Sequence, residues 1–245
     1  MKHISRSICS LLLLGSLSLA AQEKTVATAQ DTVAPPVRSD RYGLRVGVDL
    51  HRLSRSFYDD GFRGIEVVGD YRLTKKWYAA AELGNVDYTV DEPQLNFTTK
   101  GNYIKLGFDY NTYENWLDME NMLYVGLRYG FTTFSQNLNS YKIYDSSGYF
   151  DEVTAYPDKE YSGLTAQWIE VVAGLKAEVF DNIFVGFSFR LNNLISDKKP
   201  EGFDNLYLPG FNRTYDGKFG VGFNYTVSYF IPLYKKQAAV KEGKK

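Results

Sequence analysis

The chain contains few of the residues that most often carry catalytic or metal chemistry. Among its 245 residues are one Cys and two His, and Cys9 lies inside an apolar N-terminal run. A mature chain without that run has no disulfide, no thiol nucleophile and no Cys metal site. The formal net charge of -1 provides no basic surface for nucleic acid. Beyond this run, no segment reaches the roughly 18 uninterrupted apolar residues of a transmembrane helix.

The beginning of the chain has the composition of an export signal followed by a linker. Positive residues precede an apolar core, and cleavage is expected after Ala20 or Ala21, so residues 1–21 are predicted to be a signal peptide. Cys9 lies at the start of that core rather than just after it, so lipid acylation is not expected. Residues 22–40 are rich in Thr, Ala, Val and Pro without a period, and they are predicted to form a flexible periplasmic linker.

Aromatic residues are abundant and recur with a regular period. They make up 16% of the chain, with 20 Tyr and 16 Phe against 3 Trp, which is typical of the aromatic girdles of membrane barrels. The segment 219–233 has an aromatic or aliphatic residue at every odd position and mainly Gly, Asn, Thr or Ser at the even ones. Alternate side chains of a strand point to opposite faces, so this pattern predicts a strand with one apolar face. Its length suits a strand tilted across a bilayer, which needs about 9–11 residues.

Seven further segments repeat this pattern, which predicts an all-β fold. We expect an eight-stranded antiparallel up-and-down transmembrane β-barrel over residues 41–234, followed by a polar periplasmic tail at 235–245. The expected strands lie at 42–51, 64–73, 77–90, 103–110, 123–131, 169–179, 183–192 and 219–233. Short turns alternate with long loops, as in outer-membrane barrels. The long loops are expected at 91–102, 135–167 and 196–217.

Alternation alone fits both a membrane barrel and a soluble lipocalin-like barrel, whose apolar face points inward. Long strands, nearly uncharged apolar faces and Tyr or Trp near the strand ends favour the membrane barrel. The first strand, extended to Leu53, is expected to close against 219–233 and remove the sheet edges. The third strand changes parity after Gly84, which a bulge or the exit of the strand from the membrane would explain. A soluble periplasmic barrel that binds a lipid stays an alternative.

The polar faces of the expected strands carry six cations and seven anions. They are Arg45, Asp49, Glu66, Asp70, Arg72, Glu82, Lys105, Asp109, Arg128, Glu170, Lys176, Glu178 and Arg190. An eight-stranded barrel is just wide enough for side chains to fill it, and crowded buried charges are tolerated only when paired. We therefore predict a salt-bridged, plugged lumen rather than an open pore. The alternation of acids with cations favours salt bridges over a catalytic acid pair.

These features resemble a known group of proteins. With its signal, linker, eight alternating strands and the terminal run Tyr-Phe-Ile-Pro-Leu-Tyr-Lys-Lys at 229–236, the chain resembles the small outer-membrane β-barrel proteins of Bacteroidota. In architecture it resembles the OmpX and OmpA-transmembrane type. The resemblance implies the cell outer membrane, contact with its lipid and lipopolysaccharide, and insertion by the barrel assembly machinery. Because a polar tail replaces the usual terminal aromatic residue, it also implies recognition through Tyr229, Phe230 or Tyr234.

No residue is predicted to be catalytic, cofactor-binding or metal-ligating. His51, expected at the outer end of the first strand on the lumen face, has no Gly-x-Ser-x-Gly motif and no clear serine partner. Loops 135–167 and 196–217 are the candidates for contact with an extracellular partner. We predict a non-enzymatic barrel without a cofactor, in a structural or surface-interaction role. A small porin-like channel or transport component is the alternative, followed by a lipid-modifying barrel enzyme.

Overall fold

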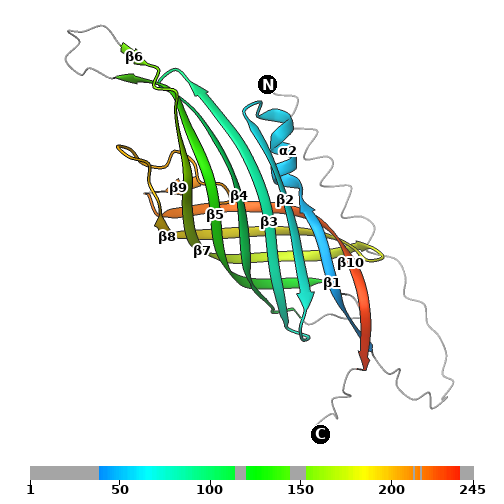
Figure 1. Ribbon diagram of the computed structural model, residues 1–245. Coiled ribbons are helices and arrows are strands. Elements are labelled where there is room, and N and C mark those ends of the chain that lie inside the picture. The colour runs from blue at the N-terminus through cyan, green and yellow to red at the C-terminus, as the bar shows by residue number, and fades with distance from the viewer. Residues whose placement is uncertain (1–38, 114–119, 144–152, 212, 216, 238–245) are drawn as a thin grey trace, which may run out of the picture. The chain divides into compact units, whose positions relative to one another are not determined.

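The computed structural model describes residues 39–113, 120–143, 153–211, 213–215 and 217–237. The predicted signal peptide and most of the predicted linker and tail lie outside these residues. The described chain contains one helix and ten strands (Figure 1): β1 (Ser39–Asp49), α2 (Leu50–Tyr58), β2 (Phe62–Arg72), β3 (Trp77–Glu92), β4 (Leu95–Asn111), β5 (Met122–Ile143), β6 (Val153–Ala155), β7 (Lys159–Phe180), β8 (Ile183–Asp197), β9 (Arg213–Tyr215) and β10 (Phe219–Gln237).

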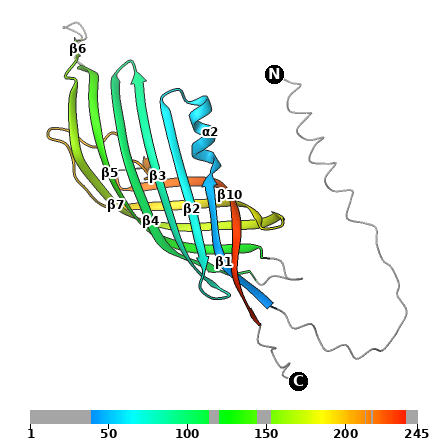
Figure 2. The ribbon, with the colours of Figure 1, turned by 45° about the vertical axis from the view of Figure 1, so that its right-hand side comes forward.

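Eight of the strands form a closed antiparallel ring. They pair in the order β1-β2-β3-β4-β5-β7-β8-β10, and β10 returns to pair with β1. The three-residue strands β6 and β9 pair beside β5 and β10, respectively, at one end of the barrel. The closing ladder runs from Ser39 opposite Gln237 to Asp49 opposite Thr226, and Figure 2 shows these two strands side by side. The predicted eight-stranded up-and-down barrel is therefore confirmed.

The last strand continues past its proline. β10 extends to Gln237, beyond the predicted barrel boundary at residue 234. Pro232 lies opposite Gly43, and a register shift next to this pair lets the ladder resume at Tyr42 opposite Tyr234. Proline has no N–H to donate, so such an irregularity is a place where a strand accepts it.

The barrel wall separates an apolar outside from a charged inside. Large apolar side chains are exposed on the outer face of every long strand, among them Val46, Val67, Leu83, Leu106, Leu127, Val171, Phe189 and Phe223. We call this surface the apolar belt. Charged residues at the alternate positions are buried, which is the reverse of a soluble lipocalin-like barrel. Within the described residues, no helix is both long and apolar enough to cross a membrane. A closed ring with this facing is the architecture of a transmembrane β-barrel.

Connection length does not separate the two ends of the barrel as cleanly as predicted. At one end, which we call the turn end, β7 and β8 are joined by a tight turn at 181–182, while β4 and β5 are joined by residues 112–121. At the opposite loop end, the hairpins are longer than predicted, and β3 and β4 are joined by residues 93–94 alone. β3 and β4 pair up to Glu92 opposite Leu95, so most of the expected loop at 91–102 is strand. β5 and β7 pair as far as Leu138 opposite Lys159, which makes much of the expected loop at 135–167 a hairpin.

The first strand ends earlier than predicted, because a helix replaces its outer part. β1 stops at Asp49, and α2 follows where the strand was expected to reach Leu53. The Asp49 side chain accepts a hydrogen bond from the His51 backbone N–H at 2.7 Å and caps the helix. Leu50, Leu53 and Phe57 have the i, i+3, i+7 spacing of one helix face, and all three are exposed. This period of 3.6, rather than 2, decides the local structure.

The change of parity in β3 is not a bulge. β2 and β3 pair without a register shift from Phe62 opposite Tyr88 to Arg72 opposite Tyr78. Val86 is fully buried and Tyr88 packs against the same interior cluster, so both point inward. The apparent change arises because the interior itself becomes apolar toward the loop end.

Candidate functional site

The middle of the lumen is filled by buried charged side chains that pair across the barrel. Glu82 on β3 lies 2.6 Å from Arg190 on β8, 3.4 Å from Lys105 on β4 and 3.4 Å from Arg128 on β5. Glu170 on β7 pairs with Arg190 at 3.1 Å and with Lys105 at 3.2 Å. None of these five residues is more than 4% exposed. A buried charge without a partner is strongly destabilising, so each of them depends on the others.

These pairs continue toward the turn end. Arg128 lies 2.7 Å from Asp109, and Lys176 connects Asp109, at 3.9 Å, with Asp70, at 2.6 Å. Arg45 then pairs with Asp70 at 3.1 Å and covers the Phe184 ring at 4.5 Å.

The pairs also continue toward the loop end. Lys105 lies 3.8 Å from Glu66, which pairs with Arg52 of α2 at 3.0 Å. Arg52 in turn lies 3.8 Å from Asp49. The connected series contains six carboxylates and six cations: Asp49, Glu66, Asp70, Glu82, Asp109 and Glu170 with Arg45, Arg52, Lys105, Arg128, Lys176 and Arg190. We call it the lumen ion-pair series.

The two remaining predicted lumen residues lie apart from this series. Arg72 and Glu178 belong to a cluster at the turn end, where Arg72 contacts Glu120 at 3.6 Å and Glu178 contacts Arg41 at 3.3 Å. Arg41 and Glu120 pair at 3.2 Å. Burial raises the pKa of Glu120, and the two neighbouring guanidinium groups oppose that rise.

Several polar partners of the series were not predicted from the sequence. Arg52 was not predicted to join the series, because its segment was interpreted as a strand. Its spacing from Asp49 is nevertheless that of residues on one face of a helix. The Tyr103 hydroxyl donates to Glu66 at 2.5 Å, and the Trp168 indole N–H donates to Glu170 at 2.6 Å. The period of 2 already placed Tyr103 on the charged face of its strand. A tyrosine at such a position does not by itself indicate that its hydroxyl donates to a carboxylate.

Toward the loop end, the interior becomes an apolar core. Its buried members are Phe62, Val86, Tyr103, Phe134, Leu164, Ala166, Trp168, Leu194, Leu208 and Phe211. The connection between β8 and β10, expected as an external loop at 196–217, folds into this core with Leu208 and Phe211. Gly210 has φ +82°, and a Cβ there would lie 2.5 Å from the Tyr103 ring. The loop therefore covers part of the barrel mouth, with Leu208 and Phe211 in the apolar core.

The packing of this loop predicts a large effect of truncating Phe211. Its ring is 1% exposed and meets Trp168 edge to face at 5.6 Å. We expect Phe211→Ala to lower the free energy of unfolding by about 3–5 kcal/mol, measured by urea titration of the reconstituted barrel. Phe203→Ala, in the same loop but only half-buried, is the control and should cost clearly less. Equal costs would contradict the packing of the loop into the mouth.

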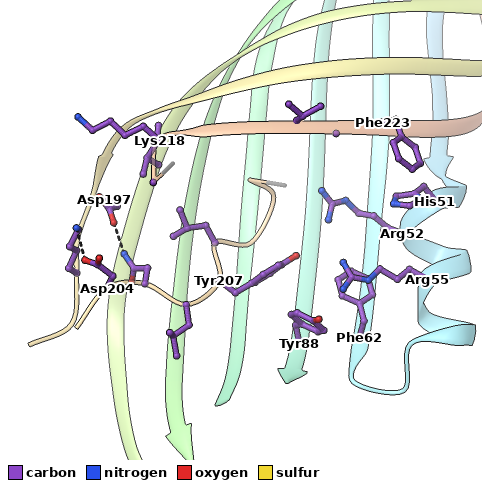
Figure 3. Close-up of a pocket in the computed structure, with 18 of the residues that line it drawn as sticks. His51, Arg52, Arg55, Phe62, Tyr88, Asp197, Asp204, Tyr207, Lys218 and Phe223 are labelled. Carbon is purple, nitrogen blue, oxygen red and sulfur yellow. Dashed lines mark hydrogen bonds and ion pairs between the residues drawn. The ribbon is translucent and has the colours of Figure 1, made fainter. Parts of the chain in front are cut away.

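Beside the apolar core, the loop end holds a cleft of about 1050 Å³. Figure 3 shows Arg52 and Arg55 pointing into it from α2, with Tyr207 of the β8–β10 connection on the facing side. Arg55 pairs with Asp59 at 2.8 Å and covers the Phe62 ring at 4.2 Å. Its other lining residues include Tyr88, Leu194, Asp197, Lys199, Asp204, Leu206, Leu208, Lys218, Val221, Gly222 and Phe223.

Most charges of the cleft are already matched by neighbours. Lys199 pairs with Asp204 at 2.6 Å, and this hydrogen bond raises the pKa of the Lys199 ammonium. The Asn205 amide donates to Asp197 at 2.8 Å. The remaining surface is largely aromatic and aliphatic, which suits a ligand with an apolar part.

His51 does not lie on the lumen face as predicted. From α2 its ring meets Phe223 at 4.8 Å and Tyr225 at 5.9 Å, both on the outward face of β10. Among the described residues, no hydroxyl or carboxylate hydrogen-bonds this ring. The same part of the chain contains no group of His, Cys, Asp and Glu that could hold a metal ion.

The apolar belt, the closed ring and the charged lumen define this molecule as a transmembrane β-barrel protein. A family model described as "Domain of unknown function (DUF6048)" matches residues 4–236, and the chain belongs to this family. No curated protein sequence matches the chain.

The solved structures that are similar to the chain include two bacterial proteins. Ail, the attachment invasion locus protein of Yersinia pestis, has 10% identity and a TM-score of 0.37, and the match covers 78% of this chain and 97% of Ail. Neisserial surface protein A has 10% identity and a TM-score of 0.36, and the match covers 78% of this chain and 96% of that protein.

Proposed function

We propose that this protein is a non-conducting outer-membrane barrel whose loop end is a surface for interaction with an extracellular partner. The observation that carries the proposal is the filled interior. The lumen ion-pair series occupies the middle of the barrel, and the apolar core with Leu208 and Phe211 occupies its mouth. A barrel of eight strands has little further space for a water-filled path. The role is therefore assigned to the outside of the molecule.

The hairpin of β5, β6 and β7 is the part of the loop end that supports an interaction role. In Figure 1 it projects beyond the rest of the barrel. Its described part carries large exposed apolar side chains, with Ile143, Val153 and Tyr156 at 51%, 57% and 76% exposure. Grouped exposed apolar side chains mark interaction sites. We therefore assign contact with an extracellular partner to this hairpin rather than to loop 196–217, because Leu208 and Phe211 of that loop are buried in the apolar core.

The proposed orientation is tested by labelling single cysteines on intact cells. Cys9 lies in the predicted signal peptide, so an introduced Cys is the only thiol expected in the mature chain. We expect a membrane-impermeant maleimide to label Tyr156→Cys on intact cells. Asp181→Cys, in the exposed turn between β7 and β8, should react only after the outer membrane is permeabilised. The opposite labelling pattern would contradict the orientation, and labelling of neither variant in the membrane fraction would contradict the location.

The proposal treats the barrel as non-enzymatic. His51 contacts aromatic rings rather than a nucleophile, so it lacks the proton-transfer partner that a hydrolase or acyltransferase needs. We expect His51→Ala to leave the lipid composition of the outer membrane the same as that of cells with the wild-type protein. A changed acylation pattern, measured by mass spectrometry of extracted lipids, would restore the lipid-modifying alternative.

A further inference from the structure

The barrel wall is incomplete as a β-sheet at one place near the loop end. β1 pairs with β10 only as far as Thr226, while β10 continues to Phe219. On the side that faces β1, β9 pairs with the first three residues of β10, at 219–221. Within the described residues, no strand pairs with 222–225 on that side. We call this interval of the wall, between β10 and α2, the seam.

The helix α2 takes the place of a strand at the seam. On one side, its His51 ring contacts Phe223 of β10. On the other side, its Ser56 hydroxyl accepts a hydrogen bond from the Gly64 N–H of β2 at 3.1 Å. An open sheet edge is tolerated at membrane depth only where protein covers it or where it borders a cavity. Here α2 covers the edge, and the cleft borders it.

The outer surface at the seam is apolar and continues the apolar belt. α2 exposes Leu50, Leu53 and Phe57 along one face, while Arg52 on its other face is buried in the lumen ion-pair series. Val221 and Phe223 are 45% and 43% exposed on the outer face of β10. The helix thus has its apolar face on the outside of the barrel and its buried cation on the inside, as the neighbouring strands do. The seam therefore lies at the level of the belt.

The cleft is lined from both sides of the wall. Val221 and Phe223 belong to the outward face of β10, whereas Phe62, Leu194 and Leu208 are buried members of the interior core, and all five line the same cavity. The cavity therefore borders β10 at the seam, where no described strand pairs with residues 222–225 on the side of β1. Figure 3 shows Phe223 beside His51 of α2 and Phe62 beside Arg55 of the same helix.

We propose that the seam admits an acyl chain of a surrounding membrane lipid into this cleft. We assign the acyl chain to a lipid of the bilayer because the outer rim of the cleft is continuous with the apolar belt. Beside the charged residues described above, the lining of the cleft includes the buried apolar side chains Phe62, Leu194 and Leu208, on which a hydrocarbon chain can pack. Its size, about 1050 Å³, is at the upper end of ordinary ligand sites. The inference rests on the membrane location proposed above, and it adds a bound lipid to that proposal.

The test is photo-crosslinking from the lipid chain to the full-length protein. The probe is a phosphatidylcholine with a diazirine at the end of one acyl chain, mixed into phosphatidylethanolamine and phosphatidylglycerol vesicles that hold the barrel. Adducts are mapped by mass spectrometry after irradiation. We expect adducts on belt residues such as Leu106 and, in addition, on interior cleft residues such as Leu194, Leu206 or Leu208. Val172, which is buried in the lumen far along the wall, should carry none.

The outcomes separate this inference from the membrane location. Adducts on the belt without adducts in the cleft would overturn the bound lipid and leave the membrane location standing. Absence of belt adducts would contradict the membrane location itself. If Val172 and the cleft are labelled equally, the probe penetrates the barrel without specificity. If the cleft is labelled only by a free diazirine fatty acid added from solution, the occupant does not come from the bilayer. Both results would overturn the inference.

A matched series of variants tests the route. Gly222 lines the cleft on β10, so Gly222→Trp should fill it and reduce cleft adducts at least tenfold relative to belt adducts. Gly222→Leu, which is smaller, should give an intermediate reduction and guards against a misfolded Trp variant. Ile231→Trp, on the outer face of β10 far from the seam, should change neither. Undiminished cleft adducts in folded Gly222→Trp would overturn the proposed route.

Discussion

Replacing Glu82 with Ala should lower the free energy of unfolding by about 3–5 kcal/mol, because it leaves three buried cations short of a partner. Glu82 contacts Arg190, Lys105 and Arg128 within 3.4 Å, and no member of this group is more than 4% exposed. The carboxylates that remain near them already have partners: Glu170 pairs with Arg190 and Lys105, and Asp109 pairs with Arg128 and Lys176. Urea titration of the barrel in lipid vesicles, followed by its heat-dependent gel migration, measures the loss.

The control for this prediction lies on the same strand. Asp87 pairs with Lys100 at 3.0 Å, with side chains 39% and 62% exposed. An ion pair of this exposure contributes about 0–1 kcal/mol, so Asp87→Ala should have a small effect. Glu82→Gln, which keeps the shape and removes the charge, should fall between the two. A loss at Glu82 no larger than the loss at Asp87 would contradict a tightly paired lumen.

An arginine on the apolar belt should be the other costly change. Leu106 is 51% exposed in the middle of β4, and its outward neighbours Ile104 and Phe108 are apolar as well. We expect Leu106→Arg to lower the free energy of unfolding in vesicles by about 2–4 kcal/mol, because a cation near the midplane of a bilayer is poorly solvated. The same variant in a detergent of short chain length should lose less.

The control is an arginine at an exposed apolar position near the end of the barrel, at a different membrane depth from Leu106. Ile195 is 52% exposed near the loop end of β8, and two residues earlier on the same face stands the polar Asn193. An arginine near the interface costs about 0–1 kcal/mol, so Ile195→Arg should be tolerated. Equal losses at the two positions would mean that Leu106 is not at membrane depth.

The sequence was sufficient to predict the ring because one physical rule governs every long strand. A lipid outside and a crowded lumen inside require period-2 alternation, and Glu82, Lys105 and Arg190 were visible as the charged positions of that period. The predicted facing also placed Leu106 outside. These features depend on the local pattern alone, and the structure shows each of these residues on the expected side of the wall.

The site at the loop end could not be predicted in the same way. α2 has nine residues, too few to outweigh the alternation that precedes it, although the cap at Asp49 and the spacing of Leu50, Leu53 and Phe57 were its signals. The inward fold of Phe211 depends on contact with Trp168, more than 40 residues earlier in the chain. The cleft joins three distant segments, and only the register of β1 against β10 reveals the seam.

Ion conductance of the reconstituted protein tests the filled lumen most directly. The full-length barrel is inserted into planar bilayers, and its heat-dependent migration confirms that the inserted sample is folded. Because the lumen ion-pair series and the apolar core with Phe211 fill the interior, we expect no discrete current steps at either polarity. Reproducible steps from the folded wild-type protein would contradict a closed lumen and would support the channel alternative.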